Sequence, residues 1–336
     1  MLERLRVGVV GSGTVLERYH IPAVNAVPEV VRSIVVDVDS NRAERIALKY
    51  GFPISSSELS DVARHADIAI VLVPNGLHAP VSCELLNQGI HVLCEKPMAR
   101  NSEECKAMIE ASVRGKAKLC IGHNRRFQQH VKLAKQIIDK GLIGEVVGVT
   151  AEEGSSDDWP RTASYFDPVI SGGGALLDVG IHSIDLIRWF AGEFKEIKYE
   201  GNGSEKTVES DASISFNLSN GASGKVVVSR TRSLAQKLTL IGSEGFIEVG
   251  LWSPNLGLRC VKGKAFQNFH RLDVAVARRP PSDGSFVEQL REFVSAIKEG
   301  HEVLVTGQVG MAAVEVVRRA YRGCSEDFIS RNSRPE

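Results

Sequence analysis

The chain has 336 residues, 43% of them hydrophobic, and its 41 Lys and Arg side chains balance its 41 Asp and Glu side chains. A chain of this length usually forms two domains, and a net charge of zero removes the general electrostatic argument for a nucleic-acid or anionic-membrane partner. We recognise neither an apolar run of membrane-spanning length nor an apolar leader, so we expect a cytoplasmic protein without a membrane partner.

The N-terminal part of the chain alternates strands with helices. Each apolar, strand-like run is followed by Gly, Pro or Asn and then by an amphipathic stretch of helix formers. The expected strands are Leu5–Val10, Ser33–Asp37, Ile68–Val73, His91–Cys94 and Lys118–Gly122. This alternation predicts an α/β domain over residues 1–123, with a doubly wound parallel sheet and right-handed crossovers.

The pattern changes over residues 124–336. A helix is expected from 126 to 140. It is followed by residues 144–153, to which no element is assigned, by an irregular polar segment at 154–173 and by a helix-like run. The strands expected after them are 197–201, 212–218, 222–229, 237–241 and 245–249, and two further helices are expected between 285 and 323. Alternating apolar residues and hairpin turns predict a second, α+β domain with a large, mostly antiparallel open sheet.

A glycine-rich turn follows the first strand. The residues expected to bind a dinucleotide there are Gly11, Ser12, Gly13, Thr14 and Val15. Gly11 permits the tight turn and Gly13 lets the backbone approach a pyrophosphate, but Leu16 stands where a third small residue usually allows the helix to pack on the strand. Asp37 ends the second strand, where a carboxylate accepts from ribose hydroxyls and favours NAD over NADP. The alternative is that Asp37 only forms a turn.

Two more strands end in polar motifs at the same edge of the predicted sheet. Pro74, Asn75 and His78 follow one strand, and Glu95-Lys96-Pro97 follows the next. Ligands of open α/β sheets bind at this carboxyl edge. Pro97 forces Lys96 into an extended conformation, which aims its side chain away from the sheet. The alternative for Lys96 is an ordinary solvated loop lysine.

An apolar, helix-like run at 174–190 contains three titratable side chains. Asp178, His182 and Asp185 are spaced at i, i+4 and i+7, so they share one helix face. Burying them is costly unless each has a partner, which leaves either a satisfied structural network or a reactive cleft. No metal site is expected, because Asp178 and His182 alone supply too few ligands and the six cysteines lack CxxC or CxxH spacing, which also predicts reduced thiols.

Taken together, these motifs resemble a known family over nearly the whole chain. They are the Gly11 and Gly13 turn with His20-Ile21-Pro22-Ala23, then Glu95-Lys96-Pro97, then residues 141–146, then Gly172-Gly173-Gly174 through Asp178-Val179-Gly180-Ile181-His182. The chain resembles the glucose-fructose oxidoreductase, inositol dehydrogenase and MocA family of NAD(P)-dependent oxidoreductases. The resemblance implies a Rossmann-type first domain that binds NAD, a second domain that forms a homodimer or homotetramer, and a sugar, cyclitol or other polyol substrate.

The resemblance also implies roles for individual residues. Lys96, Asp178 and His182 form the implied catalytic set, and the residues implied near the cofactor are Pro74, Asn75, His78, Glu95, Lys96 and Asn124. In our hypothesis His182 takes the hydroxyl proton of a secondary alcohol, Lys96 stabilises the alkoxide, and Asp178 orients one of them or holds a second hydroxyl. Asp185 lies one turn further along the helix, away from the cleft, and is expected to have a supporting structural role.

The substrate and the overall reaction remain open. In the polar loop, Trp159, Arg161 and Tyr165 are candidates for substrate contacts, since Trp stacks on sugar rings and Arg binds anions or hydroxyl pairs. Sugars, amino sugars, nucleotide sugars and cyclitols are all candidate substrates. Two other functions are considered: an NAD-dependent glycoside hydrolase that uses transient oxidation, and a non-catalytic NAD-binding sensor.

Overall fold

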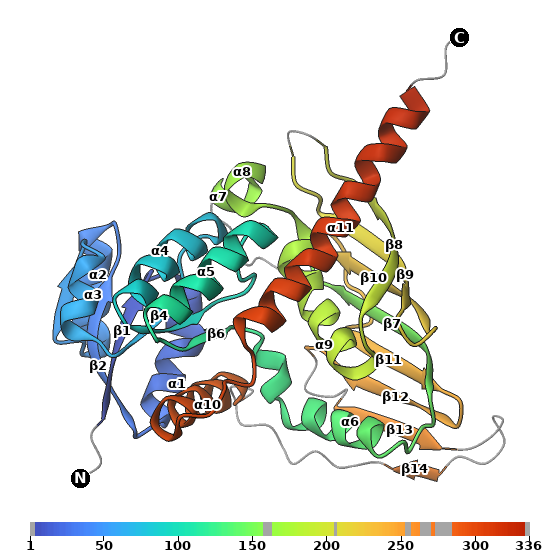
Figure 1. Ribbon diagram of the computed structural model, residues 1–336, viewed down its shortest axis with the longest axis horizontal. Helices are drawn as coiled ribbons and strands as arrows, with labels where there is room; N and C mark the ends of the chain where they lie inside the picture. Colours follow the sequence, from blue (N-terminus) through green and yellow to red (C-terminus); the bar gives the residue numbers. More distant parts are fainter. Residues whose placement is uncertain are drawn as a thin grey trace.

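Six parallel strands form the sheet of the N-terminal domain, in the order β3-β2-β1-β4-β5-β6 (Figure 1). The computed structural model describes residues 4–156, 163–204, 207–252, 257–262, 270–272 and 284–332. The strands are β1 (Leu5–Val10), β2 (Val30–Val36), β3 (Ile54–Ser56), β4 (Ile68–Val71), β5 (His91–Cys94) and β6 (Leu119–Ile121). The helices between them are α1 (Ile21–Ala26), α2 (Ser40–Tyr50), α3 (Ser60–His65), α4 (Asn75–Asn87) and α5 (Ser102–Arg114). This is the strand order of a Rossmann fold, so the predicted parallel sheet is confirmed.

The apolar strands of this sheet lie in its interior. Every residue of β4 is buried, as are the last four residues of β1, because helices cover both faces of a parallel sheet. The edge strand β3 was not expected. It contains only one apolar residue, Ile54, in three, which is too little for a periodic signal.

The helix after the glycine turn begins irregularly. Leu16 is fully buried, and the helix opens with a π-helical turn, Leu16–His20, before α1. A π turn is wider than an α turn. Leu16, which stands where a small residue is usual, therefore coincides with a wider turn of the helix, and the glycine turn before it is retained.

The second domain contains an eight-stranded sheet in the order β14-β13-β12-β11-β7-β10-β9-β8. Its strands are β7 (Val146–Gly154), β8 (Phe194–Gly201), β9 (Asp211–Leu218), β10 (Ser223–Ser229), β11 (Lys237–Gly242), β12 (Gly245–Gly250), β13 (Leu258–Lys262) and β14 (His270–Leu272). Only β7 and β10 pair in parallel, so the prediction of a mostly antiparallel sheet is confirmed. Strand β7 covers most of residues 144–153, which had been assigned no structure, and ends one residue later at Gly154.

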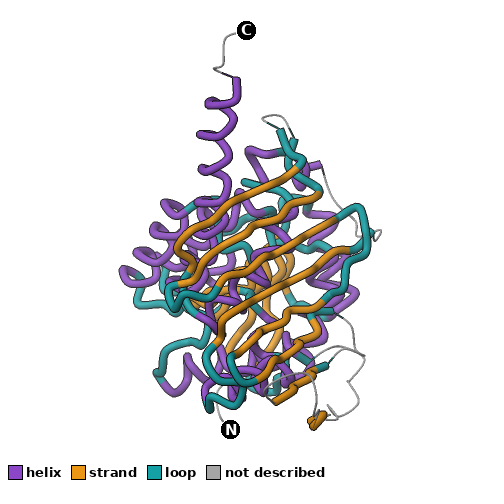
Figure 2. Tube along the Cα trace, turned by 90° about the vertical axis from the view of Figure 1, so that its right-hand side faces the viewer, coloured by secondary structure: helices purple, strands orange, loops and turns teal. Residues whose placement is uncertain are grey.

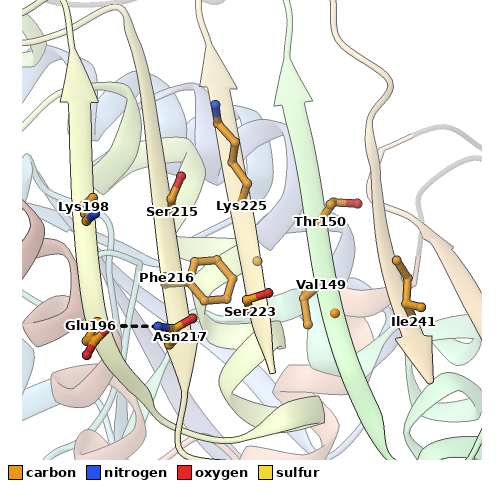
Figure 3. Close-up of a pocket in the computed structure, with 12 residues that line it drawn as sticks. Val149, Thr150, Glu196, Lys198, Ser215, Phe216, Asn217, Ser223, Lys225 and Ile241 are labelled. Atoms are coloured by element: carbon orange, nitrogen blue, oxygen red, sulfur yellow. Dashed lines mark hydrogen bonds between the residues drawn. The ribbon is translucent and has the colours of Figure 1, made fainter. Parts of the chain in front are cut away.

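Helices lie behind this sheet in Figure 2, and its other face is open. On the open face, side chains of five neighbouring strands surround a shallow depression of about 500 Å³ (Figure 3). Thr150, Ser215 and Lys225 point outward there, and Asn217 donates a hydrogen bond of 2.8 Å to Glu196. Homo-oligomerisation through this sheet, which the family resemblance implied, stays a prediction.

The remaining helices lie within the second domain or between the two domains. They are the 3-10 turn η2 (Asn124–Phe127), α6 (Gln129–Asp139), α7 (Ala163–Phe166), α8 (Pro168–Ser171), the π turn η3 (Leu176–Gly180), α9 (Ile181–Ala191), α10 (Ser285–Glu299) and α11 (Gly307–Asn332). Helix α10 lies beside α1 of the first domain, where Phe286 stacks on Tyr19 with ring centroids 4.7 Å apart (Figure 1). Thr306 forms an isolated bridge with Cys120. The boundary at residues 123 and 124 stays a prediction, and the chain returns to the first domain after residue 284.

One segment passes a length and composition test for a membrane span. The most apolar stretch of Pro168–Ala191 has a mean hydropathy of 1.2, and 72% of this stretch is buried inside the molecule. The sequence prediction that no run reaches this length was therefore wrong. The segment is nevertheless part of the core, because its helix α9 lies between η2, α6, α11 and the large sheet (Figure 1).

Candidate functional site

The turn after β1 leaves room for a ligand at the carboxyl edge of the parallel sheet. Gly11 has φ +94°, and a Cβ there would lie 2.8 Å from the backbone carbonyl of Leu72. A Cβ on Gly13 would meet no protein atom within 4 Å. Glycine is thus required at the first position by the protein itself, and at the second it keeps the backbone open to an approaching group such as a pyrophosphate.

Asp37 holds this turn. Its Oδ2 accepts hydrogen bonds from the backbone N (2.8 Å) and Oγ (2.6 Å) of Ser12, and its Oδ1 accepts from the backbone N of Asp39 (3.0 Å). Burial raises the pKa of Asp37, but these hydrogen bonds and the charge of Arg42 outweigh it, so the net shift is downward. The carboxylate is ionised at the place where a dinucleotide ribose would lie. Asp37 also stabilises the turn, which was the alternative role considered from the sequence.

Lys96 and Asp178 form an ion pair between the two domains. The Nζ of Lys96 donates to Oδ1 of Asp178 at 2.9 Å and to its backbone carbonyl at 2.8 Å. Lys96 follows β5 and precedes a cis peptide to Pro97, whereas Asp178 lies in the π turn η3. The side chains are 19% and 22% exposed, so Lys96 is not an ordinary solvated lysine.

Two further donors bind the same carboxylate. Tyr165 of α7 donates its hydroxyl to Oδ2 of Asp178, and Nη2 of Arg230, just after β10, lies 3.2 Å from that oxygen. The guanidinium of Arg230 also lies 4.0 Å from the ring centroid of Tyr165. Burial alone would raise the pKa of Asp178, but Lys96, Arg230 and the Tyr165 hydrogen bond hold it well below its usual range. Asp178 is a permanent anion that orients two cations.

His182 lies in the first turn of α9 with its side chain buried. Its Nδ1 has no hydrogen-bond partner among the described residues. Burial lowers the pKa of His182, and the charges of Arg125 and Lys96 lower it further, so the ring is neutral at physiological pH. A neutral imidazole is able to accept a proton.

A second histidine, His123, lies beside His182. It follows β6 at the carboxyl edge of the parallel sheet, is 1% exposed, and its ring centroid is 6.2 Å from that of His182 in an edge-to-face arrangement. Neither ring nitrogen has a hydrogen-bond partner among the described residues. His123 was not predicted from the sequence, although its place directly after a predicted strand was a usable signal.

Two buried ion pairs flank the histidines. Arg126 binds Asp185 through two hydrogen bonds of 2.8 and 2.7 Å. Arg125 binds Glu153 in the same bidentate way, with Nη1 and Oε2 2.8 Å apart. Asp185 is thus a supporting residue, as expected, whereas Arg125, like Arg230, had no signal in the sequence.

The other residues implied near the cofactor are bound to the protein. Glu95 accepts a hydrogen bond from Nε2 of His20 (2.9 Å), Asn75 donates to the carbonyl of Ser171 (3.1 Å), and Asn124 donates to Ser285 (2.9 Å). Pro74 caps the start of α4. Their contacts with a cofactor stay predictions.

His78 is also bound to the protein, and its place near a cofactor stays a prediction. Its side chain is 1% exposed, and its nitrogens lie 2.7 Å from the carbonyl of Pro97 and 2.9 Å from that of Val73. Both polar atoms face the main chain of the protein, because the imidazole fills the space between the ends of β4 and β5. The structure therefore gives His78 a supporting role for the Lys96-Pro97 loop.

The proposed substrate loop is described only in part. Trp159 and Arg161 lie outside the described residues, whereas Tyr165 contacts Asp178. Within the described ranges, no group of three or more His, Cys, Asp or Glu side chains is placed to hold a metal ion. The five cysteines in those ranges whose side chains are described are free thiols.

Known proteins share both the sequence and the fold of this chain. The model of an oxidoreductase family with an NAD-binding Rossmann fold matches residues 5–123, and that of the GFO/IDH/MocA C-terminal domain matches residues 131–248. Inositol 2-dehydrogenase of Rhizobium meliloti is 26% identical over 96% of this chain and 97% of its own length. Levoglucosan dehydrogenase of Pseudarthrobacter phenanthrenivorans is 32% identical over 58% of this chain and 53% of its own length.

Solved structures agree. Levoglucosan dehydrogenase in complex with NADH and levoglucosan superposes with a TM-score of 0.86 at 22% identity, covering 96% of this chain and 98% of that one. Aldose-aldose oxidoreductase from Caulobacter crescentus, complexed with glycerol, gives a TM-score of 0.83 at 25% identity, covering 97% and 98%. Together with the glycine turn and the Lys96, Asp178 and His182 cluster, these matches show that the chain belongs to the glucose-fructose oxidoreductase, inositol dehydrogenase and MocA family of oxidoreductases.

Proposed function

We propose that this protein oxidises a secondary alcohol of a sugar or cyclitol, with His182 as the general base, Lys96 as the cation that stabilises the alkoxide, and NAD as the hydride acceptor. The observation that carries the proposal is the ion pair of Lys96 with Asp178 at the carboxyl edge of the parallel sheet, which brings Lys96 close enough to His182 for its charge to lower the pKa of the imidazole. Lys96 comes from the first domain, and Asp178 and His182 come from the second.

The state of each group suits this reaction. His182 is neutral, because burial and the nearby cations Arg125 and Lys96 lower its pKa, so it can take the hydroxyl proton. Lys96 stays in place through its bonds to Asp178 and supplies positive charge where the oxygen becomes negative. When bound, NAD would supply the hydride acceptor for the carbinol carbon, so that the secondary alcohol and NAD would give a ketone, NADH and one proton.

We propose NAD in preference to NADP. The ionised carboxylate of Asp37 lies where the ribose would bind, and it would repel a 2′-phosphate. Arg42 lies nearby, with Nη1 4.0 Å from Oδ2 of Asp37, but Asp37 and Asp39 partly neutralise it.

The family relatives suggest the substrate class. Two of them are named for inositol and levoglucosan, which are both ring polyols. Tyr165 and Arg230 border Asp178 and are able to contact substrate hydroxyls beside Lys96. We propose a ring polyol with at least two neighbouring hydroxyl groups.

The test is NADH formation, measured as absorbance, with myo-inositol, levoglucosan and glucose, each with NAD and with NADP. We expect net NADH with at least one of them, a preference for NAD, and a loss of at least about a hundredfold in kcat for His182→Asn. His130→Phe changes a buried histidine of α6 outside the site and serves as the control, with wild-type kcat expected. Glycoside cleavage without net NADH would instead indicate the hydrolase, and NAD binding without any turnover would indicate the sensor.

A further inference from the structure

His123 is a buried histidine whose nitrogens are both unpaired among the described residues. An unsatisfied buried polar group usually costs about 1–3 kcal/mol, so a fold rarely keeps two of them on one side chain without a reason. His123 lies next to His182, whose Nδ1 is also buried and unpaired. The polar atoms of the two rings are therefore potential partners for each other.

The carboxylate of Asp185 lies on the Nδ1 side of the His123 ring. Its Oδ2 lies 4.0 Å from Nδ1 of His123, which is too long for a hydrogen bond but close enough for the charge to act. A carboxylate only accepts hydrogen bonds, so the neutral ring is favoured with its hydrogen on Nδ1 and a free lone pair on Nε2. Arg126 holds Asp185 in place with two hydrogen bonds.

We propose that His123 is a positioning residue for His182: its Nε2 accepts a hydrogen bond from Nδ1 of His182 through one bridging water, because the two rings make no direct hydrogen bond. This leaves the lone pair of His182 on Nε2, where it faces the substrate hydroxyl, and it stabilises the imidazolium that forms when the proton moves. The inference deepens the proposed function and rests on it, because it assigns His182 a tautomer suited to a general base.

Charged groups surround both rings from every side. Those that act on His123 are Asp185 of α9, Arg126 of η2, and Lys96 and Glu95 after β5, and those that act on His182 are Arg125 of η2 and Lys96. Burial is the largest effect and lowers the pKa of His123; Asp185 raises it, and Arg126 and Lys96 lower it. His123 is consequently neutral when His182 receives its proton, as an acceptor must be.

A first experiment needs no substrate. The NAD-saturated protein, labelled with ¹⁵N-histidine, is examined by NMR at pH 7, and the signals of His123 and His182 are assigned by their loss in His123→Phe and His182→Asn. We expect a single Nδ1–H tautomer for both rings, and an appreciable Nε2–H population of His182 in His123→Phe. An Nε2–H tautomer of His182 in the unaltered chain, or one unchanged by His123→Phe, would overturn the proposal.

A second experiment separates positioning from packing. In His123→Phe the ring shape is kept and the buried nitrogens of His123 are removed, while Nδ1 of His182 loses its acceptor, so the free energy of unfolding should stay close to that of the unaltered chain. We expect kcat to fall at least about tenfold on whichever of myo-inositol, levoglucosan and glucose is oxidised fastest, with the KM for NAD within about twofold. The acid limb of kcat/KM against pH should move to lower pH, because the imidazolium of His182 loses its acceptor.

The matched control is His130→Phe. It removes a 2.9 Å contact between His130 and the carbonyl of Gly250, so stability should fall while the pH profile stays unchanged. Wild-type kcat and an unmoved acid limb in His123→Phe would mean that His123 only fills space. If none of the three polyols is oxidised, the proposed function fails, and the tautomer measurement still decides the role of His123.

Discussion

At the scale of single residues, Asp178 is the anion that organises the site. It accepts from Lys96, Arg230 and Tyr165, which come from three different parts of the chain. Replacing a buried ion-pair partner leaves the opposite charge without compensation, and that costs more than the pair itself gained. The contacts of Asp178 therefore serve both the stability of the domain junction and the position of Lys96.

The substitution Asp178→Asn tests both roles. It leaves the charges of Lys96 and Arg230 without a counter-ion, and we expect a loss of about 2 kcal/mol in unfolding free energy, reduced from the fully buried value because the Asp178 side chain is 22% exposed. NADH formation should fall at least about a hundredfold, since Lys96 loses its fixed position. Urea unfolding and steady-state kinetics measure the two effects.

The control for this substitution is Tyr165→Phe, which removes one donor to Asp178 and keeps both ion pairs. A smaller loss in both measurements is expected. Equal losses in the two variants would show that the Tyr165 hydrogen bond, and not the charge of Asp178, holds the site.

At the scale of elements, two glycines have different roles in the turn between β1 and the first helix. Gly11 has a positive φ and no room for a Cβ, whereas Gly13 has neither constraint within the protein. The first glycine is required for folding of the turn. The second is explained only by a ligand that approaches the backbone.

We therefore expect Gly11→Ala and Gly13→Ala to differ. Gly11→Ala should lower the unfolding free energy by about 1–3 kcal/mol in the absence of cofactor. Gly13→Ala should leave that stability unchanged or slightly higher, yet weaken NAD binding at least about tenfold, because its methyl group occupies the space of the pyrophosphate. Urea unfolding without NAD and calorimetric titration with NAD provide the two measurements. Unchanged NAD affinity in Gly13→Ala would place the pyrophosphate elsewhere.

Most elements were predictable because their signal is local. Strands β1 and β5 have the predicted limits, and the end of the apolar run at β4 placed the polar edge correctly. The edge strand β3 is too short for a periodic pattern, and the π turns at Leu16–His20 and Leu176–Gly180 leave no pattern in side-chain spacing. The sequence predicted that Lys96, Asp178 and His182 belong together only through resemblance, since their meeting depends on how the domains pack.

The partners of these residues were harder to predict. Arg230 and Arg125 become parts of the site through contacts across the sheet and between segments far apart in the chain. No local period encodes such contacts. His123 was detectable in principle, because the carboxyl ends of parallel strands meet at one edge and His123 follows the last of them.

At the scale of the whole molecule, the buried histidines link stability to pH. His78, His91, His123 and His182 all have pKa values lowered from the ordinary value of 6.5, in each case chiefly by burial. As pH falls below 6.5, the unfolded chain binds protons at these residues before the folded chain does. The folded state therefore loses stability as pH falls below 6.5, by up to about 1.4 kcal/mol per pH unit for each such histidine.

The carboxylates add a second loss at lower pH. Asp37, Glu95 and Asp178 have lowered pKa values in the folded protein, so their contribution is present above the unfolded values near 4 and is lost as pH falls through their folded values. The fall between pH 6.5 and pH 5 consequently belongs to the histidines. Thermal unfolding at half-unit steps of pH should show Tm decreasing over that interval.

The substitution His123→Phe isolates the contribution of one histidine to this decrease in Tm with falling pH. Phenylalanine binds no proton in either state, so the decrease in Tm between pH 6.5 and pH 5 should be shallower in this variant than in the unaltered chain. A parallel decrease in both proteins would mean that His123 is protonated in the folded state over this range, and a cationic His123 has no lone pair to offer His182. The stability curve of the whole molecule thus tests the same protonation state that the proposed role of His123 in the site requires.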